Sequence, residues 1–187
     1  MIFEPLRLPG LFLISPKRFG DARGFFSETF SQKLFNEHVG DTSFVQDNHS
    51  FSSMVGVLRG LHFQKPPYDQ GKLVRVSRGK VLDVVVDIRR GSPTYGQSVQ
   101  VELSADNWQQ LWVPPGFAHG FLTLEPDTEF LYKVTNFYAP ESEGGIRYDD
   151  PDLGIQWPIA ADRLTLSDKD KILPLLRDFD TPFVYET

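Results

Sequence analysis

The chain has 187 residues, of which 40% are hydrophobic and 24% charged, and its net charge at pH 7 is −6. The length predicts a single globular domain over 1–187, and the acidic balance argues against a general nucleic-acid binder, which needs a basic surface. The absence of cysteine excludes disulfides, thiolate zinc sites and cysteine nucleophiles. No apolar run approaches the length of a membrane span or of a signal-peptide core, so we expect a cytoplasmic protein without a membrane partner.

Short apolar runs separated by Gly and Pro clusters predict an all-β protein with a few short peripheral helices. A short helix is expected at 31–38, and alternating or continuous apolar runs predict strands at 81–88, 99–103 and 130–134. Near the C-terminus, 167–170 has the pattern of a helix cap, for a helix that runs to about 177. Strands at this spacing indicate a sandwich or a barrel.

Two of the four histidines lie in informative surroundings. His62 follows the Gly-punctuated run 56–61, and His119 ends a Pro-x-Gly-x-x-His pattern that is typical of the second half of the cupin signature. A metal-binding cupin would also carry His-x-His and a Glu in the first half. His62 stands there without a second histidine, so we expect no metal site. For His119, a buried structural histidine and a ligand contact are equally good interpretations.

The neighbours of His62 favour a functional site over a purely structural strand. Arg59, Gln64 and the segment 46–50 bring many polar groups together, and each would cost free energy if buried without a partner. In a regular strand, however, Arg59 and His62 point to opposite faces. We therefore predict a bulge or other irregularity at Gly60, which would let both side chains face one cavity.

Spacing alone says less about the remaining candidates. Lys72 at the start of a strand has the pattern of a solvated charge. Tyr132 shares the inward face of the strand at 130–134, where its hydroxyl needs a hydrogen-bond partner. Asp170 has the pattern of a helix cap. Arg23 and Glu28 form either a surface pair of little energetic value or contacts to a ligand's phosphate and base.

Taken together, these segments resemble the dTDP-4-dehydrorhamnose 3,5-epimerase family of the cupin superfamily over essentially the whole chain. The resemblance implies a cupin-type jelly-roll barrel, a homodimer and a site inside the barrel. It implies dTDP-4-dehydro-6-deoxy-D-glucose as the substrate, inverted at C3 and C5 on the route to dTDP-rhamnose. The ordered motifs that carry it are Asp21–Glu28, Gln46–Ser50, Gly56–Gln64, Lys72–Arg75, Leu82–Arg89, Gly91–Gly96, Pro114–Gly120, Tyr132–Val134, Gly145–Arg147 and Leu166–Asp170.

The same resemblance implies a role for each matching residue. His62 would be the proton acceptor and Tyr132 the proton donor, while Lys72 would stabilise the enolate and Asp170 would pair with His62. The implied substrate contacts within the subunit are Gln46, Asn48, Arg59, His119, Glu143 and Lys169. The implied nucleotide contacts from the partner subunit are Arg23 and Glu28, and the aromatics that would pack on the thymidine are Phe19, Phe26 and Tyr138.

These residue types suit an epimerisation through an enolate. C3 and C5 flank a C4 ketone, so a base on one face and an acid on the other can invert either centre. No redox change occurs and no Gly-x-Gly-x-x-Gly loop is present, so we expect no cofactor. The alternatives are an epimerase that acts at one carbon, a ketoisomerase on another dTDP-4-keto-6-deoxy sugar, a metal-dependent cupin oxygenase, and a non-catalytic sugar-nucleotide binding module.

Overall fold

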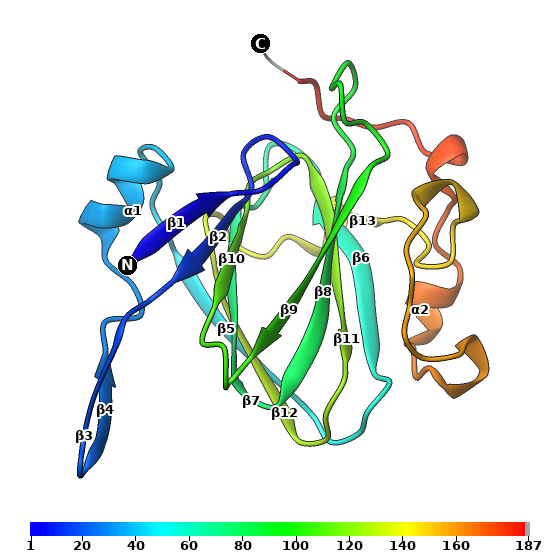
Figure 1. The fold of residues 1–187 in the computed structure, drawn as a ribbon. Helices are drawn as coiled ribbons and strands as arrows, with labels where there is room; N and C mark the ends of the chain where they lie inside the picture. The colour runs from blue at the N-terminus through cyan, green and yellow to red at the C-terminus, as the bar shows by residue number, and fades with distance from the viewer. Residues whose placement is uncertain (186–187) are drawn as a thin grey trace.

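Two antiparallel sheets face each other in the computed structural model, which describes residues 1–185 (Figure 1). The six-stranded sheet has the order β1 (Ile2–Pro5), β2 (Phe12–Ser15), β10 (Gln110–Val113), β7 (Lys72–Arg78), β12 (Thr128–Val134) and β5 (Gln46–Ser52). The five-stranded sheet has the order β13 (Glu143–Gly145), β6 (Leu58–Gln64), β11 (Phe117–Thr123), β8 (Lys80–Asp87) and β9 (Ser98–Ser104). The strands predicted at 81–88, 99–103 and 130–134 are therefore confirmed.

The connectivity of strands β5 to β12 is that of a jelly roll. Four of these strands lie in each sheet, in the orders β5-β12-β7-β10 and β6-β11-β8-β9. The chain crosses from one sheet to the other after every strand except β8, which pairs directly with β9. Such crossing gives a double-sheet barrel with side chains filling its interior. The expected cupin-type jelly roll is confirmed.

Apolar side chains form three layers around the two sheets. One cluster fills the space between the sheets and includes Val74, Val85 and Phe130. A second covers the outer face of the five-stranded sheet, where the segment 146–183 packs against Val84 and its neighbours. In β8, therefore, the continuous apolar face points outward under the C-terminal segment, while the face that carries Asp83 points into the barrel.

The third cluster lies on the outer face of the six-stranded sheet beneath α1 (Gln32–His38). Phe35 from α1 packs edge-on against Trp112 of β10, with ring centroids 5.0 Å apart. Ser31 caps the helix through a hydrogen bond from the backbone amide of Leu34 to its side-chain oxygen. The helix predicted at 31–38 is confirmed. Within residues 1–185, no helix is long and apolar enough to cross a membrane.

The C-terminal segment is less helical than predicted. In place of a helix from 167 to 177, α2 spans only Asp168–Lys171. Proline cannot occupy a helix interior without losing a backbone hydrogen bond, so Pro174 stops the helix early. The rest of the segment contains short 3₁₀ turns, namely η1 (Pro140–Ser142), η2 (Pro151–Leu153), η3 (Ala161–Arg163) and η4 (Leu176–Asp178).

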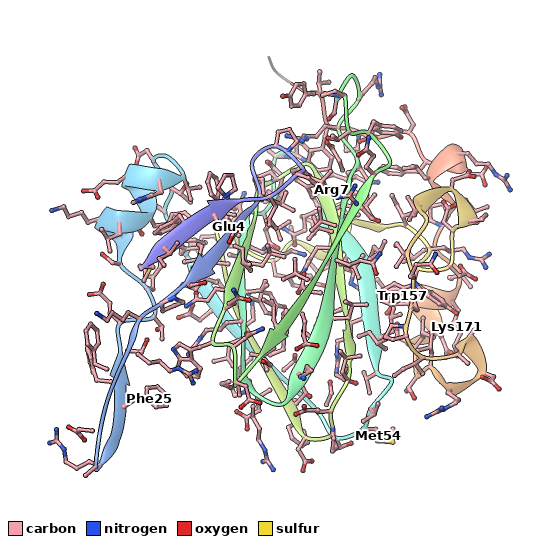
Figure 2. All side chains as sticks on the ribbon, in the orientation of Figure 1. Glu4, Arg7, Phe25, Met54, Trp157 and Lys171 are labelled. Atoms are coloured by element: carbon pink, nitrogen blue, oxygen red, sulfur yellow. The ribbon has the colours of Figure 1, made fainter. Side chains whose placement is uncertain are left out.

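A two-stranded hairpin projects away from the barrel near the N-terminus (Figure 1). It consists of β3 (Arg18–Asp21) and β4 (Gly24–Ser27), and almost every residue in it is exposed. Its aromatic side chains Phe19, Phe25 and Phe26 are all more than half exposed, and Figure 2 shows Phe25 on this arm. An exposed aromatic cluster of this kind is typical of an interaction surface.

Candidate active site

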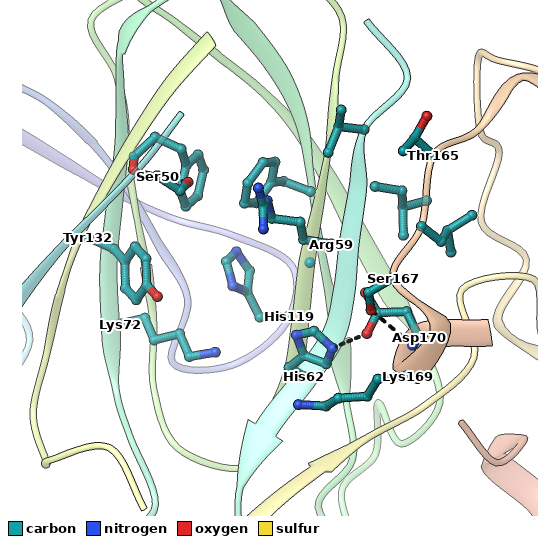
Figure 3. Close-up of a pocket in the computed structure, with 16 residues that line it drawn as sticks. Ser50, Arg59, His62, Lys72, His119, Tyr132, Thr165, Ser167, Lys169 and Asp170 are labelled. Atoms are coloured by element: carbon teal, nitrogen blue, oxygen red, sulfur yellow. Dashed lines mark hydrogen bonds and ion pairs between the residues drawn. The ribbon is translucent and has the colours of Figure 1, made fainter. Parts of the chain in front are cut away.

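A cavity of about 450 Å³ opens between the two sheets. Strands β6 and β11 form one wall, β7 and β12 form the opposite wall, and the segment 165–170 lies at its edge. Figure 3 shows Tyr132 and Lys72 on one side of this space and His62 with Asp170 on the other. The predicted site residues that line the cavity are Arg59, His62, Lys72, His119, Tyr132, Lys169 and Asp170.

His62 and Asp170 form a hydrogen-bonded pair at this cavity. His62 Nε2 lies 2.5 Å from Asp170 Oδ1, and Asp170 is buried while His62 is partly exposed. Because a carboxylate only accepts hydrogen bonds, Nε2 carries a proton and Nδ1 is the ring nitrogen left to act as a base.

The carboxylate of Asp170 is held in its ionised form. Burial by itself would raise the pKa of Asp170, but hydrogen bonds and charge from His62, together with the hydrogen bonds from Ser167 and the backbone of Gly60, lower it below its ordinary value. The backbone amide of Asp170 also donates to the side chain of Ser167, the cap of α2. A charged Asp170 stabilises an imidazolium on His62.

The predicted irregularity at Gly60 is confirmed, and it explains why Arg59 and His62 face the same cavity. In the pairing of β6 with β11, His62 lies opposite His119 and Arg59 lies opposite Phe121, so two residues of β6 oppose one of β11. Gly60 has φ +125°, a conformation that favours glycine. A Cβ on Gly60 would also come within 2.6 Å of the backbone of Gly120.

The opposite wall provides an ammonium and a phenol. Burial lowers the pKa of Lys72 to about 8, against an opposing effect of the negative charges of Asp83 and Glu143. Burial raises the pKa of Tyr132, with a smaller lowering effect of the nearby Arg59. At neutral pH, therefore, Tyr132 is a protonated phenol that can donate a proton, and Lys72 carries a positive charge that can stabilise an oxyanion.

His119 is the buried, hydrogen-bonded histidine that was one of its two interpretations, and its position in the cavity wall leaves the ligand contact as a prediction. It lines the cavity, and it is buried and paired with Asp83, whose carboxylate oxygens lie 2.9 and 3.0 Å from His119 Nε2. No role for Asp83 was predicted from the sequence. The available signal was a carboxylate inside an otherwise apolar strand, which requires a buried partner.

Four other predicted contacts do not line this cavity, namely Gln46, Asn48, Tyr138 and Glu143. Glu143 forms an ion pair with Lys169. Gln46 donates a hydrogen bond of 2.9 Å to Asn48 and accepts one from the backbone of Tyr138 at 3.4 Å. These side chains link β5, β13, α2 and the segment after β12.

Four predicted contacts lie on or directly after the hairpin and do not reach the cavity of their own chain. Arg23 pairs with Asp21 at the tip of the hairpin, while Phe19, Phe26 and Glu28 lie outside the barrel. None of the four lines the cavity. Within residues 1–185, no group of three or more His, Asp or Glu side chains could hold a metal ion.

The sequence matches one family of known proteins over most of its length. A family model described as dTDP-4-dehydrorhamnose 3,5-epimerase matches residues 5–178. A protein of that name from Sinorhizobium fredii is 51% identical over 185 residues, which cover 99% of this chain and 94% of the relative.

Two solved structures share both the fold and much of the sequence. The first is a dTDP-6-deoxy-D-glucose-3,5-epimerase from Legionella pneumophila in complex with dTDP-4-keto-L-rhamnose. It has a TM-score of 0.94 and 48% identity, and the match covers 100% of this chain and 99% of that one. The second is a 3′-monoepimerase from Streptomyces bikiniensis in complex with dTDP-quinovose. It has a TM-score of 0.87 and 36% identity, and the match covers 92% and 87% of the two chains.

Proposed function

The chain belongs to the dTDP-4-dehydrorhamnose 3,5-epimerase family, and from this premise we propose that it inverts C3 and C5 of dTDP-4-dehydro-6-deoxy-D-glucose. The product is dTDP-4-dehydro-L-rhamnose. The observation that carries the proposal is the cavity itself, in which an imidazole and a phenol occupy opposite walls with an ammonium beside the phenol. A sugar held between them meets a base on one face and an acid on the other.

In the proposed reaction, His62 Nδ1 removes the proton from C3 or C5. The electron pair of that C–H bond forms a double bond to C4, and the π electrons of the carbonyl move onto the C4 oxygen, which becomes negatively charged. The Lys72 ammonium stabilises this enolate, as a donor aimed at a developing oxyanion does. Tyr132 then returns a proton to the opposite face of the same carbon, which inverts it. Asp170 supports His62 by fixing its tautomer and stabilising the imidazolium.

The substrate's polar groups would be held by side chains around the cavity. We assign this role to Gln46, Asn48, Arg59, His119, Glu143 and Lys169, and we assign stacking on the base to Tyr138, which is 55% exposed. Cationic side chains suit a diphosphate, and an exposed aromatic ring suits a pyrimidine. Because a charged nucleotide sugar does not cross membranes unaided, we also propose a cytoplasmic location.

The remaining contacts would come from a second copy of the chain. Arg23, Phe26 and Glu28 lie on or directly after the hairpin that projects from the barrel, so in a homodimer they could enter the partner's cavity. The test is to mix Arg23→Ala and His62→Ala subunits. If the arm acts on the partner, a mixed dimer has one intact site, and a random mixture recovers about a quarter of the wild-type sites. If the arm acts on its own subunit, mixing restores nothing.

The activity itself is tested by NMR of the product formed in deuterated water. We expect turnover of dTDP-4-dehydro-6-deoxy-D-glucose with deuterium at both C3 and C5. Tyr132→Phe should impair completed inversion more than exchange, because it removes the acid and leaves the base. Absence of turnover would overturn the proposal.

The second candidate is a single-carbon epimerase, favoured by the similarity to the 3′-monoepimerase. It predicts deuterium at C3 alone. The higher identity to the 3,5-epimerases supports the first candidate.

A further inference from the structure

A second histidine–carboxylate pair lies inside the barrel. Asp83 on β8 has no exposed surface, and His119 on the neighbouring strand β11 is 6% exposed. Asp83 lies opposite Phe121 and His119 lies opposite Val85, so the two residues are diagonal neighbours on the inner face. Within residues 1–185, His119 is the one side chain that is hydrogen-bonded to the Asp83 carboxylate.

Burying the Asp83 carboxylate costs folding free energy, and the packing around it does not explain why a carboxylate stands there. A buried carboxylate costs free energy unless several donors surround it. Asp87, further along β8, meets that condition, because Arg89, Ser92 and Thr94 all donate to it. Asp83 has one imidazole nitrogen instead. Among apolar neighbours on the same face of β8, an apolar residue would stabilise the barrel at least as well.

Asp83 lies behind the wall of the cavity that Lys72 also lines, because its carboxylate is hydrogen-bonded to the cavity-lining His119. Its negative charge is the larger of the two that oppose the lowering of the Lys72 pKa by burial, the other being that of Glu143. Within the described residues, the Lys72 ammonium makes no ion pair closer than 4.0 Å. A carboxylate in this position favours the ammonium without occupying the donors that a substrate oxygen would need.

The other ionisable groups around Lys72 do not replace Asp83. The groups that share the cavity with Lys72 are Arg59 and His62 from β6, His119 from β11, Tyr132 from β12, and Lys169 and Asp170 from α2. Glu143 is in direct contact with Lys169 and Asp170 with His62, so each of these carboxylates is already paired.

We propose that Asp83 is a positioning residue for the epimerisation, which holds His119 in one orientation and keeps Lys72 charged so that it can stabilise the enolate. This inference rests on the proposed function for its consequence in catalysis. Because Nε2 of His119 faces a carboxylate, Nδ1 is the ring nitrogen that the pair leaves for a sugar hydroxyl. Asp83 touches neither the substrate nor the reacting atoms in this scheme.

The test is the pH profile of deuterium exchange in Asp83→Asn, which keeps the shape and removes the charge. Loss of the proton from Lys72 should set the alkaline limb, and we expect that limb to move down by about one pH unit. At pH 8, where Lys72 is half protonated in the wild type, exchange should then be about fivefold slower, with a much smaller change at pH 6.5. Lys72→Arg should remove the limb in either background, because arginine stays protonated.

The matched control is Asp87→Asn, which changes a second fully buried aspartate of the same strand. It should lower the melting temperature and leave the limb where it is. If Asp83→Asn folds poorly, Asp83→Ala provides a second route, in which added formate should occupy the vacated space and move the limb back up. An unmoved limb in folded Asp83→Asn, or no response of Asp83→Ala to formate, would overturn the proposal.

Titration of Lys72 followed by ¹³C NMR of labelled lysine separates this proposal from the proposed function. It needs no turnover, so the Asp83 effect is measured even in a protein that proves inactive on the expected substrate. We expect the Lys72 titration to move to lower pH in Asp83→Asn and to stay in place in Asp87→Asn. Equal titration of Lys72 in wild type and Asp83→Asn would contradict the inference.

Discussion

Two histidine–aspartate pairs face one cavity, and they are built in opposite ways. His62 and Asp170 are 108 residues apart in sequence, and they join a barrel strand to a helix of four residues. His119 and Asp83 are 36 residues apart and lie on neighbouring strands of one sheet. The first histidine is partly exposed to the cavity, while both members of the second pair are buried.

The difference shows how one chemical unit can serve two purposes. A partly exposed imidazole with a buried carboxylate behind it can accept a proton from a bound molecule and stabilise the charge that it gains. In the second pair the imidazole is only 6% exposed, so we assign to this pair the orientation of a ring and a fixed charge rather than proton transfer. The exposure of the imidazole, rather than the identity of the residues, separates the two roles.

The largest expected effect comes from removing the accessible imidazole. His62→Ala should reduce deuterium exchange at both C3 and C5 by about 10³-fold or more, because it removes the base that takes those protons. NMR of the sugar in deuterated water measures it. His38→Ala, in α1 and away from the cavity, is the control and should exchange normally. Near-normal exchange in His62→Ala would break the comparison, because the base would then have to be sought elsewhere, His119 included.

Lys72→Met should lower the rate about 10²- to 10³-fold, the usual cost of losing one oxyanion donor. It should also raise the free energy of unfolding at pH 7, on the order of 1 kcal/mol, because a charged lysine no longer has to be buried. Burial lowers the Lys72 pKa to about 8 from 10.5, so this penalty is complete below pH 8. This penalty fades as the pH rises through 10.5. Above that pH, Lys72 is neutral in both the folded and the unfolded chain. Urea unfolding at pH 7 and pH 10.5 measures the difference, and a variant less stable than wild type at pH 7 would contradict it.

Asp170→Asn should slow exchange by about 10²-fold, since the imidazolium on His62 loses its charged partner. The pKa of Asp170 is lowered in the folded chain, so its ionised form stabilises the fold above the unfolded pKa of ~3.9, and that stability is lost as the pH falls through the folded value. Wild type should therefore be more stable than the variant at pH 7, and the difference should shrink as the pH falls below the unfolded pKa of ~3.9. A stability difference that is independent of pH would show that the pair has no electrostatic role.

The smallest effect is expected from Ser167→Ala, which removes the cap of α2. Losing a cap costs ~1 kcal/mol of helix stability, and here it loosens the helix that carries Asp170. We expect a few-fold slower exchange. Ser31→Ala removes the equivalent cap of α1 and should leave exchange unchanged, because α1 is remote from the cavity. Equal effects of the two variants would mean that α2 does not hold Asp170 in place beside His62.

Much of this protein could be predicted from the sequence. Apolar runs between glycine–proline turns indicated the strands, because a strand buried on one face alternates with period two and a strand buried on both faces is apolar throughout. The polar groups around His62 indicated a site. The alternation of side chains along a strand, which would separate Arg59 from His62, was enough to predict the irregularity at Gly60. The ordered motifs indicated the family.

Tertiary structure alone decided which residues meet. The pairing of His62 with Asp170 spans 108 residues, and spacing showed Asp170 only as a helix cap. The apolar face of β8 was visible in the sequence, but only the C-terminal segment packed on it showed that Asp83 points inward. Local sequence determines how side chains alternate between the two faces of a strand. Which face becomes the inside of the barrel, and therefore which carboxylate is buried there, depends on contacts between segments far apart in the chain.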